Sequence, residues 1–60
     1  MADDELMGVA EIARLLGVSR QRVDQLARQH GFPEPIARLE AGRIWAAVEV
    51  RRWDAKRRGG

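Results

Sequence analysis

The chain has 60 residues, with eleven lysines and arginines, nine acids and one histidine, which gives a net charge of +2 at pH 7. A chain of this length forms one domain with a small core. Because it contains no cysteine, disulfide bonds and thiolate metal sites are excluded, as a reducing cytoplasm requires. No apolar run approaches the roughly 20 residues that span a bilayer, and the acidic start is unlike a secretory signal. We therefore expect a cytoplasmic protein without membrane contact.

The charge is distributed unevenly along the chain. Residues 1–13 carry four acids and no base, whereas the part from Arg14 onward carries eleven bases against five acids, a net charge of +6. Ten of the eleven bases are arginine, whose planar guanidinium suits bidentate contact with phosphate and guanine. This distribution favours a polyanionic partner, although a solvated basic surface or codon bias in a GC-rich genome would give the same composition.

Apolar spacing predicts two helices separated by a tight turn. We expect a flexible acidic tail over residues 1–7, a folded domain over 8–57 and a loose end over 58–60. In residues 9–16, apolar side chains recur at the i, i+3, i+4 and i+7 positions and form one face of a helix. Ala13 is small and leaves room on this face for a second helix. Gly17 can take the left-handed backbone that ends this helix, and Ser19 can cap the next one. The second helix is expected over 19–30. Its inward side chains are predicted to be Val23, Leu26, Ala27 and His30.

A hairpin and a third helix complete the expected fold. The segment IARLEAGRIW contains two short β-prone runs joined at Ala41 and Gly42, with glycine at the strained position. After it, Val50 and Trp53 lie one turn apart in a helix expected over 47–57. The predicted fold is mostly α with a small β-hairpin. It is a winged helix-turn-helix, in the order helix, turn, helix, two-stranded wing, helix.

The second helix carries the side chains that suit base recognition. A helix fits the major groove of DNA and reads base edges with residues near its N-terminus. Arg20 can donate two hydrogen bonds to guanine, and Gln21 and Gln25, one turn apart, can each pair with adenine. Trp45 and Trp53 could stack on single-stranded bases, but a domain of this size needs them for its core.

Other side chains suit the phosphate backbone. Ser19 and the free N–H groups at the start of the second helix attract phosphate, and Arg22 and Arg28 can clamp the backbone on either side. On the wing, Arg38 and Arg43 can reach a neighbouring groove or its phosphates. The alternative is that both are ordinary edge-strand charges that discourage pairing with other sheets.

Several residues have more modest interpretations. Asp24 lies four residues before Arg28, the favourable spacing for an ion pair on a helix, although it could also accept a hydrogen bond from cytosine. His30 is expected to pack or to stabilise the end of its helix, since one histidine without cysteine makes no transition-metal site. Ser19 is the only serine, and no Cys, Thr or Tyr can act as a nucleophile. We expect no enzymatic activity and no cofactor.

The chain resembles the compact MerR-like winged helix-turn-helix domains of the AlpA and excisionase type over about residues 8–57. The resemblance is carried by VAEIARLLGVSRQRV, the FPEP loop, the GRIW segment and the spacing of Trp45, Glu49, Val50 and Trp53. It implies a bacterial or phage protein whose second helix reads the groove through Ser19, Arg20, Gln21 and Gln25. Arg38 and Arg43 are then wing contacts. The dimerising coiled coil and ligand domain of longer MerR regulators are missing, so no small-molecule effector is expected.

The primary hypothesis is a sequence-specific double-stranded DNA-binding protein that acts as a small, nucleoid-associated transcription regulator. One alternative is an excisionase-like recombination directionality factor that binds and bends DNA. A further alternative is an interaction module that contacts RNA polymerase or an integrase and does not bind DNA. Because one copy reads only a few base pairs, cooperative self-association on direct repeats is expected.

Overall fold

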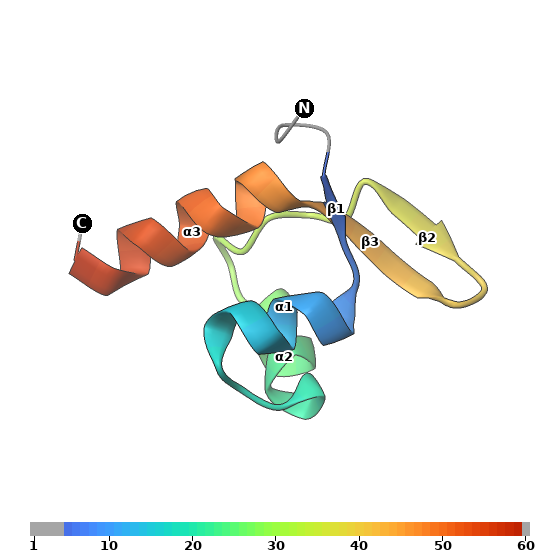
Figure 1. Ribbon diagram of the computed structural model, residues 1–60, viewed down its shortest axis with the longest axis horizontal. Coiled ribbons are helices and arrows are strands. Elements are labelled where there is room, and N and C mark those ends of the chain that lie inside the picture. The colour runs from blue at the N-terminus through green and yellow to red at the C-terminus, as the bar shows by residue number, and fades with distance from the viewer. Residues whose placement is uncertain (1–4, 60) are drawn as a thin grey trace.

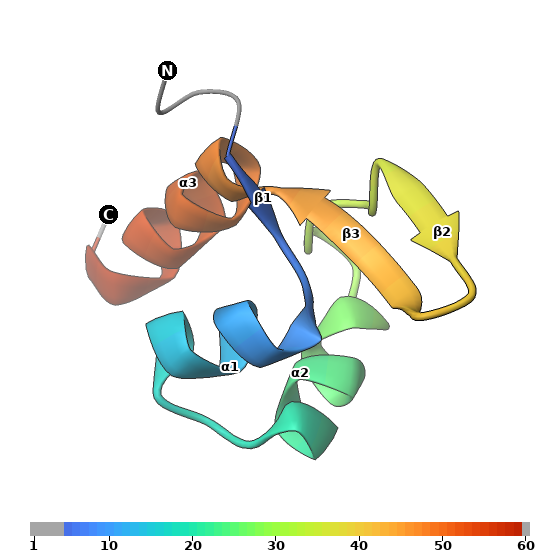
Figure 2. The ribbon, with the colours of Figure 1, turned by 45° about the vertical axis from the view of Figure 1, so that its right-hand side comes forward.

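The computed structural model describes residues 5–59, and its structure is mostly helical. Within this range there are three helices, α1 (Val9–Leu16), α2 (Arg20–Ala27) and α3 (Ala47–Gly59), and three strands, β1 (Leu6–Met7), β2 (Ala37–Leu39) and β3 (Gly42–Ala46). The strands form one antiparallel sheet in the order β1-β3-β2. In Figures 1 and 2, α3 leaves one end of β3 and the β2–β3 hairpin projects from the other, while α1 and α2 pack together beside the sheet.

The first helix and the turn that follows it confirm the prediction. α1 has the expected bounds, and at its start the Glu11 carboxylate accepts a hydrogen bond of 3.0 Å from the backbone N–H of Gly8. Gly17 has a left-handed backbone with φ of 72°, which lets the chain turn sharply without strain. The Ser19 hydroxyl then accepts a hydrogen bond of 3.0 Å from the backbone N–H of Arg22. These local contacts place the start of α2 beside the end of α1.

The second helix is shorter than predicted, because it ends at Ala27 instead of His30. The backbone N–H groups of Arg28 and Gln29 donate to carbonyls only three residues earlier, which tightens the chain after Ala27. Gly31 then takes a φ of 101° and redirects it. As a result, Val23 and Leu26 are buried as expected, whereas His30 is exposed and leaves the inward face. Its predicted packing role is therefore wrong.

The sheet has a third strand in the segment where a flexible tail is expected. Leu6 pairs with Ala46 and Met7 pairs with Trp45. The backbone N–H of Ala47 also donates to the carbonyl of Glu5 at 2.9 Å. A two-residue strand is too short to show alternation in the sequence, and it forms because β3 offers an unpaired edge. Residues 1–4 of the expected tail lie outside the described residues.

The hairpin is present, but its turn lies one residue earlier than predicted. Leu39 pairs with Gly42, so the turn residues are Glu40 and Ala41. Gly42 begins β3 with a φ of 133°, a conformation that other residues rarely adopt, so the glycine does occupy the strained position. The predicted two-stranded wing is thus part of a three-stranded sheet, in which β2 is one edge.

The core lies between α1, α2, the inner face of the sheet and α3, and Trp45 is its largest fully buried side chain. The ring of Phe32 meets Trp45 edge to face, with centroids 6.1 Å apart, and meets Trp53 at 4.8 Å. Core packing of both tryptophans is confirmed, since Trp53 is half-buried against this cluster. The buried core residues are Met7, Ile12, Ala13, Leu16, Val23, Leu26, Phe32, Trp45, Ala47 and Val50.

The third helix extends to Gly59, two residues beyond the prediction and into the expected loose end. The buried carboxylate of Asp54 holds this last turn, because it pairs with Arg57 at 3.1 Å and with Arg58 at 3.0 Å. Gly60 lies outside the described residues. None of the helices in the described range is both long and apolar enough to cross a membrane.

Candidate nucleic-acid interface

The solvent-facing side of α2 presents polar and basic side chains. With 3.6 residues per turn, Gln21, Gln25 and Arg28 fall opposite the buried Val23 and Leu26. Arg20 begins the helix beside this face. Seven of the eight predicted contact residues are exposed. They are Ser19, Arg20, Gln21, Arg22, Gln25, Arg28 and Arg38.

Two of the predicted contact residues are joined to each other. The Nη1 atom of Arg22 donates a hydrogen bond of 3.1 Å to Oε1 of Gln25. A bidentate contact with adenine uses both the oxygen and the amide nitrogen of a glutamine. One lone pair of the Gln25 oxygen is thus occupied by Arg22 and the other remains for adenine, whereas Gln21 makes no side-chain hydrogen bond within residues 5–59.

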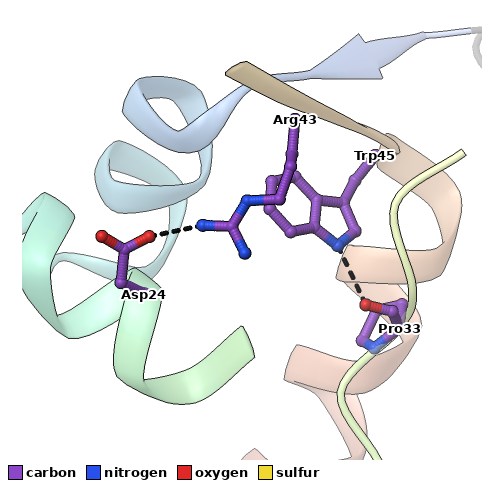
Figure 3. Close-up of polar contacts among 4 residues, drawn as sticks. All are labelled: Asp24, Pro33, Arg43 and Trp45. Atoms are coloured by element: carbon purple, nitrogen blue, oxygen red, sulfur yellow. Dashed lines mark hydrogen bonds and ion pairs between the residues drawn. The ribbon is translucent and has the colours of Figure 1, made fainter. Parts of the chain in front are cut away.

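Asp24 pairs with a different arginine from the predicted one. Its carboxylate receives a hydrogen bond of 2.5 Å from Nη2 of Arg43 on β3, a residue 19 positions away in the sequence. The predicted ion pair with Arg28 is absent from the described residues, so that prediction is wrong. The physical reason is that the long side chain of Arg43 reaches from β3 to the carboxylate on α2, as Figure 3 shows, and provides a tertiary partner for Asp24.

The side chain of Arg43 consequently lies between α2 and the hairpin. Its side chain is only 31% exposed, and its guanidinium lies 5.2 Å from the centre of the buried Trp45 ring. Arg38 stands directly opposite it on β2 and is exposed. Of the two arginines predicted on the wing, Arg38 is thus open to a partner, whereas Arg43 is engaged by Asp24 and Trp45.

Arg43 lines two hollows in the surface. One, of about 250 Å³, lies between the start of α1, Arg20 and the hairpin, and its charged lining residues are Glu11, Arg20 and Arg43. The other, of about 340 Å³, lies between the end of α2, the following loop and the hairpin. Its charged or titratable lining residues are Arg28, His30, Glu34, Arg38 and Arg43. The sequence predicted neither hollow, because both depend on how the hairpin folds against the helix.

Chemically, the arrangement combines hydrogen-bonding side chains on a helix with a basic concave surface beside it. Within residues 5–59 no carboxylate forms an ion pair with Arg20, Arg22, Arg28 or Arg38. No three potential metal ligands gather in that range either. Such a surface suits an extended polyanion.

Comparison of the chain with protein-family models, curated proteins and solved structures gives no match.

Proposed function

We propose that this chain is a sequence-specific double-stranded DNA-binding domain with a winged helix-turn-helix layout, and that it acts as a small transcription regulator. The observation that carries the proposal is the exposed face of α2, on which Gln21, Gln25 and Arg28 lie opposite the buried Val23 and Leu26. In this arrangement α2 enters the major groove, and the β2–β3 hairpin contacts the adjacent backbone or minor groove.

Base recognition comes from the first turns of α2. Arg20 donates two hydrogen bonds to the O6 and N7 atoms of guanine, and Gln21 pairs with adenine. Gln25 joins them through the second lone pair of its oxygen and its amide N–H, while Arg22 contacts a phosphate with its remaining N–H groups. The Ser19 hydroxyl caps the helix and stays bonded to the backbone N–H of Arg22. The neighbouring free N–H groups at the start of α2 face a phosphate of the DNA backbone.

Backbone contacts come from arginines on both sides of the larger hollow. Arg28 at the end of α2 and Arg38 on β2 line its walls, which supports a phosphate path between helix and hairpin. An eight-residue helix is about 12 Å long, so one copy covers roughly three to four base pairs. Useful specificity then requires several copies bound cooperatively to repeated sites.

Selection of bound duplexes from a randomised pool tests this function. The proposal predicts enrichment of one short motif containing a guanine, and footprints that extend by whole repeats as the protein concentration rises. Arg20→Ala should relax the guanine position. Arg52→Ala is the control with the same loss of charge, since Arg52 is exposed on α3 and outside both hollows. A pool that remains random after several rounds would contradict the proposal.

A further inference from the structure

A chain of contacts joins α2 to the hairpin and to the loop after α2. Asp24 accepts from Arg43, Arg43 lies over the face of Trp45, and Nε1 of Trp45 donates to the carbonyl of Pro33 at 2.9 Å. Figure 3 shows the contacts among these four residues, with Arg43 reaching from β3 toward the carboxylate on α2. Because Trp45 is fully buried, this end of the chain of contacts is rigidly held by the core.

The cross-strand register places Arg43 beside a second positive charge. Arg38 and Arg43 are directly opposite each other on β2 and β3, and like charges in that position destabilise a strand pair. Asp24 offsets the charge of Arg43 from the neighbouring helix. Without this carboxylate, two guanidinium groups would repel each other across the hairpin.

We propose that Asp24 is a positioning residue for DNA recognition, which holds the hairpin against α2 through Arg43. This inference rests on the proposed function. By fixing the hairpin, Asp24 sets the offset between Arg20, which reads bases, and Arg38, which binds the backbone. Arg43 then serves as the hairpin side of this link and not as a phosphate contact. Positioning of this kind favours the correct duplex over all others.

The proposal makes a prediction opposite in sign to that of simple electrostatics. Asp24 is an anion beside the DNA surface, so charge alone predicts that Asp24→Asn tightens binding to every duplex. If Asp24 positions the hairpin, the variant instead loses preference for the selected sequence while binding to random DNA is kept or strengthened. The measured quantity is the ratio of the affinities for selected and random duplexes of equal length at one salt concentration.

The experiment compares Asp24→Asn with the control Glu49→Gln, which also removes one negative charge but from an exposed pair within α3. We expect the affinity ratio to fall about tenfold in Asp24→Asn, within the usual range for coupled contacts, and to stay unchanged in Glu49→Gln. The conservative variant Asp24→Glu, which keeps the carboxylate, should retain most of the ratio. An unchanged ratio in Asp24→Asn, or a loss in Asp24→Glu as large as that in Asp24→Asn, would overturn the proposal.

Arg43→Gln breaks the same link from the hairpin side, so the test survives if one variant fails to fold. This variant should lower the affinity ratio without changing the slope of affinity against salt, because a positioning residue neutralises no phosphate. A slope reduced by about one would instead make Arg43 a backbone contact and overturn its assigned role.

A measurement without DNA separates this inference from the proposed function. Residual dipolar couplings of backbone amides report the orientation of the outer part of the hairpin, residues 38–43, relative to α2, whereas Trp45 stays fixed in the core. We expect one fixed orientation of residues 38–43 in the wild type and in Asp24→Glu, and averaged couplings of these residues in Asp24→Asn. If the wild type binds no duplex, the proposed function fails. The couplings still decide whether Asp24 positions the hairpin, and unchanged couplings in Asp24→Asn would refute that role.

Discussion

The indole Nε1 of Trp45 donates a hydrogen bond of 2.9 Å to the carbonyl oxygen of Pro33. This bond fastens the central strand β3 to the loop between α2 and β2, at a side chain that is fully buried. The packing of the hairpin, and with it the shape of the larger hollow, depends on this internal contact between two segments 12 positions apart.

Trp45→Phe should therefore destabilise the domain even though it keeps an aromatic ring. The Pro33 carbonyl loses its partner, at a cost of about 1–3 kcal/mol in the free energy of unfolding. Urea denaturation followed by circular dichroism measures the loss. Trp53→Phe is the matched control, because Trp53 is only half-buried and its ring contact with Phe32 is kept. Equal losses in both variants would contradict the role assigned to the hydrogen bond.

Gly17→Ala tests the turn between α1 and α2. A Cβ at Gly17 would meet no atom within 4 Å, so any cost comes from the left-handed backbone and not from a clash. We expect a loss of about 1–2 kcal/mol in the free energy of unfolding. Gly59→Ala also places a Cβ in open space, but its backbone is helical, so its effect should be close to zero or slightly favourable. A neutral Gly17→Ala would contradict the turn geometry.

Asp54→Ala tests the end of α3. The Asp54 side chain is 11% exposed and receives Arg57 and Arg58, so its removal should cost about 1–3 kcal/mol. Glu49→Ala removes a 53% exposed carboxylate whose pair with Arg52 is 3.7 Å long, and exposed pairs of this kind contribute at most about 1 kcal/mol. Thermal unfolding of the two variants in parallel gives the comparison. A larger loss from Glu49→Ala would show that Asp54 does not hold the helix end.

Arg20→Ala and Arg38→Ala should weaken DNA binding in different ways. In the proposed function Arg20 reads a base, so its loss should relax one position of the site by about 1–3 kcal/mol. Arg38 is proposed to contact phosphate, so its loss should weaken selected and random duplexes alike. Titration of both duplexes with each variant measures the difference. If the two variants lose affinity in the same proportion on both duplexes, the assigned roles are wrong.

The features that the sequence predicted well depend on neighbouring residues. The bounds of α1 follow from the apolar spacing of residues 9–16, and the turn follows from the conformational freedom of Gly17 and the hydroxyl of Ser19. The hairpin was also predictable, because two β-prone runs flank a glycine. In each case the cause lies within a few residues of its effect.

The missed features depend on contacts between distant segments. β1 exists because β3 provides an edge some 40 positions later, and two residues show no period of their own. The helical spacing of Asp24 and Arg28 indicated a local ion pair, whereas the tertiary fold brings Arg43 to the same carboxylate. The exposed face of α2 was predicted from its period. The position of this face relative to the hairpin could not be predicted, because it depends on how the whole domain packs.

The dependence of duplex affinity on salt tests the central claim most directly. Arg20, Arg22, Arg28 and Arg38 are exposed and form no ion pair within the described residues. If Arg22, Arg28 and Arg38 neutralise three phosphates while Arg20 contacts a base, the logarithm of the affinity should fall with the logarithm of the salt concentration at a slope of about −3. A flat response, or no duplex binding at low salt, would contradict DNA binding as the function of this chain.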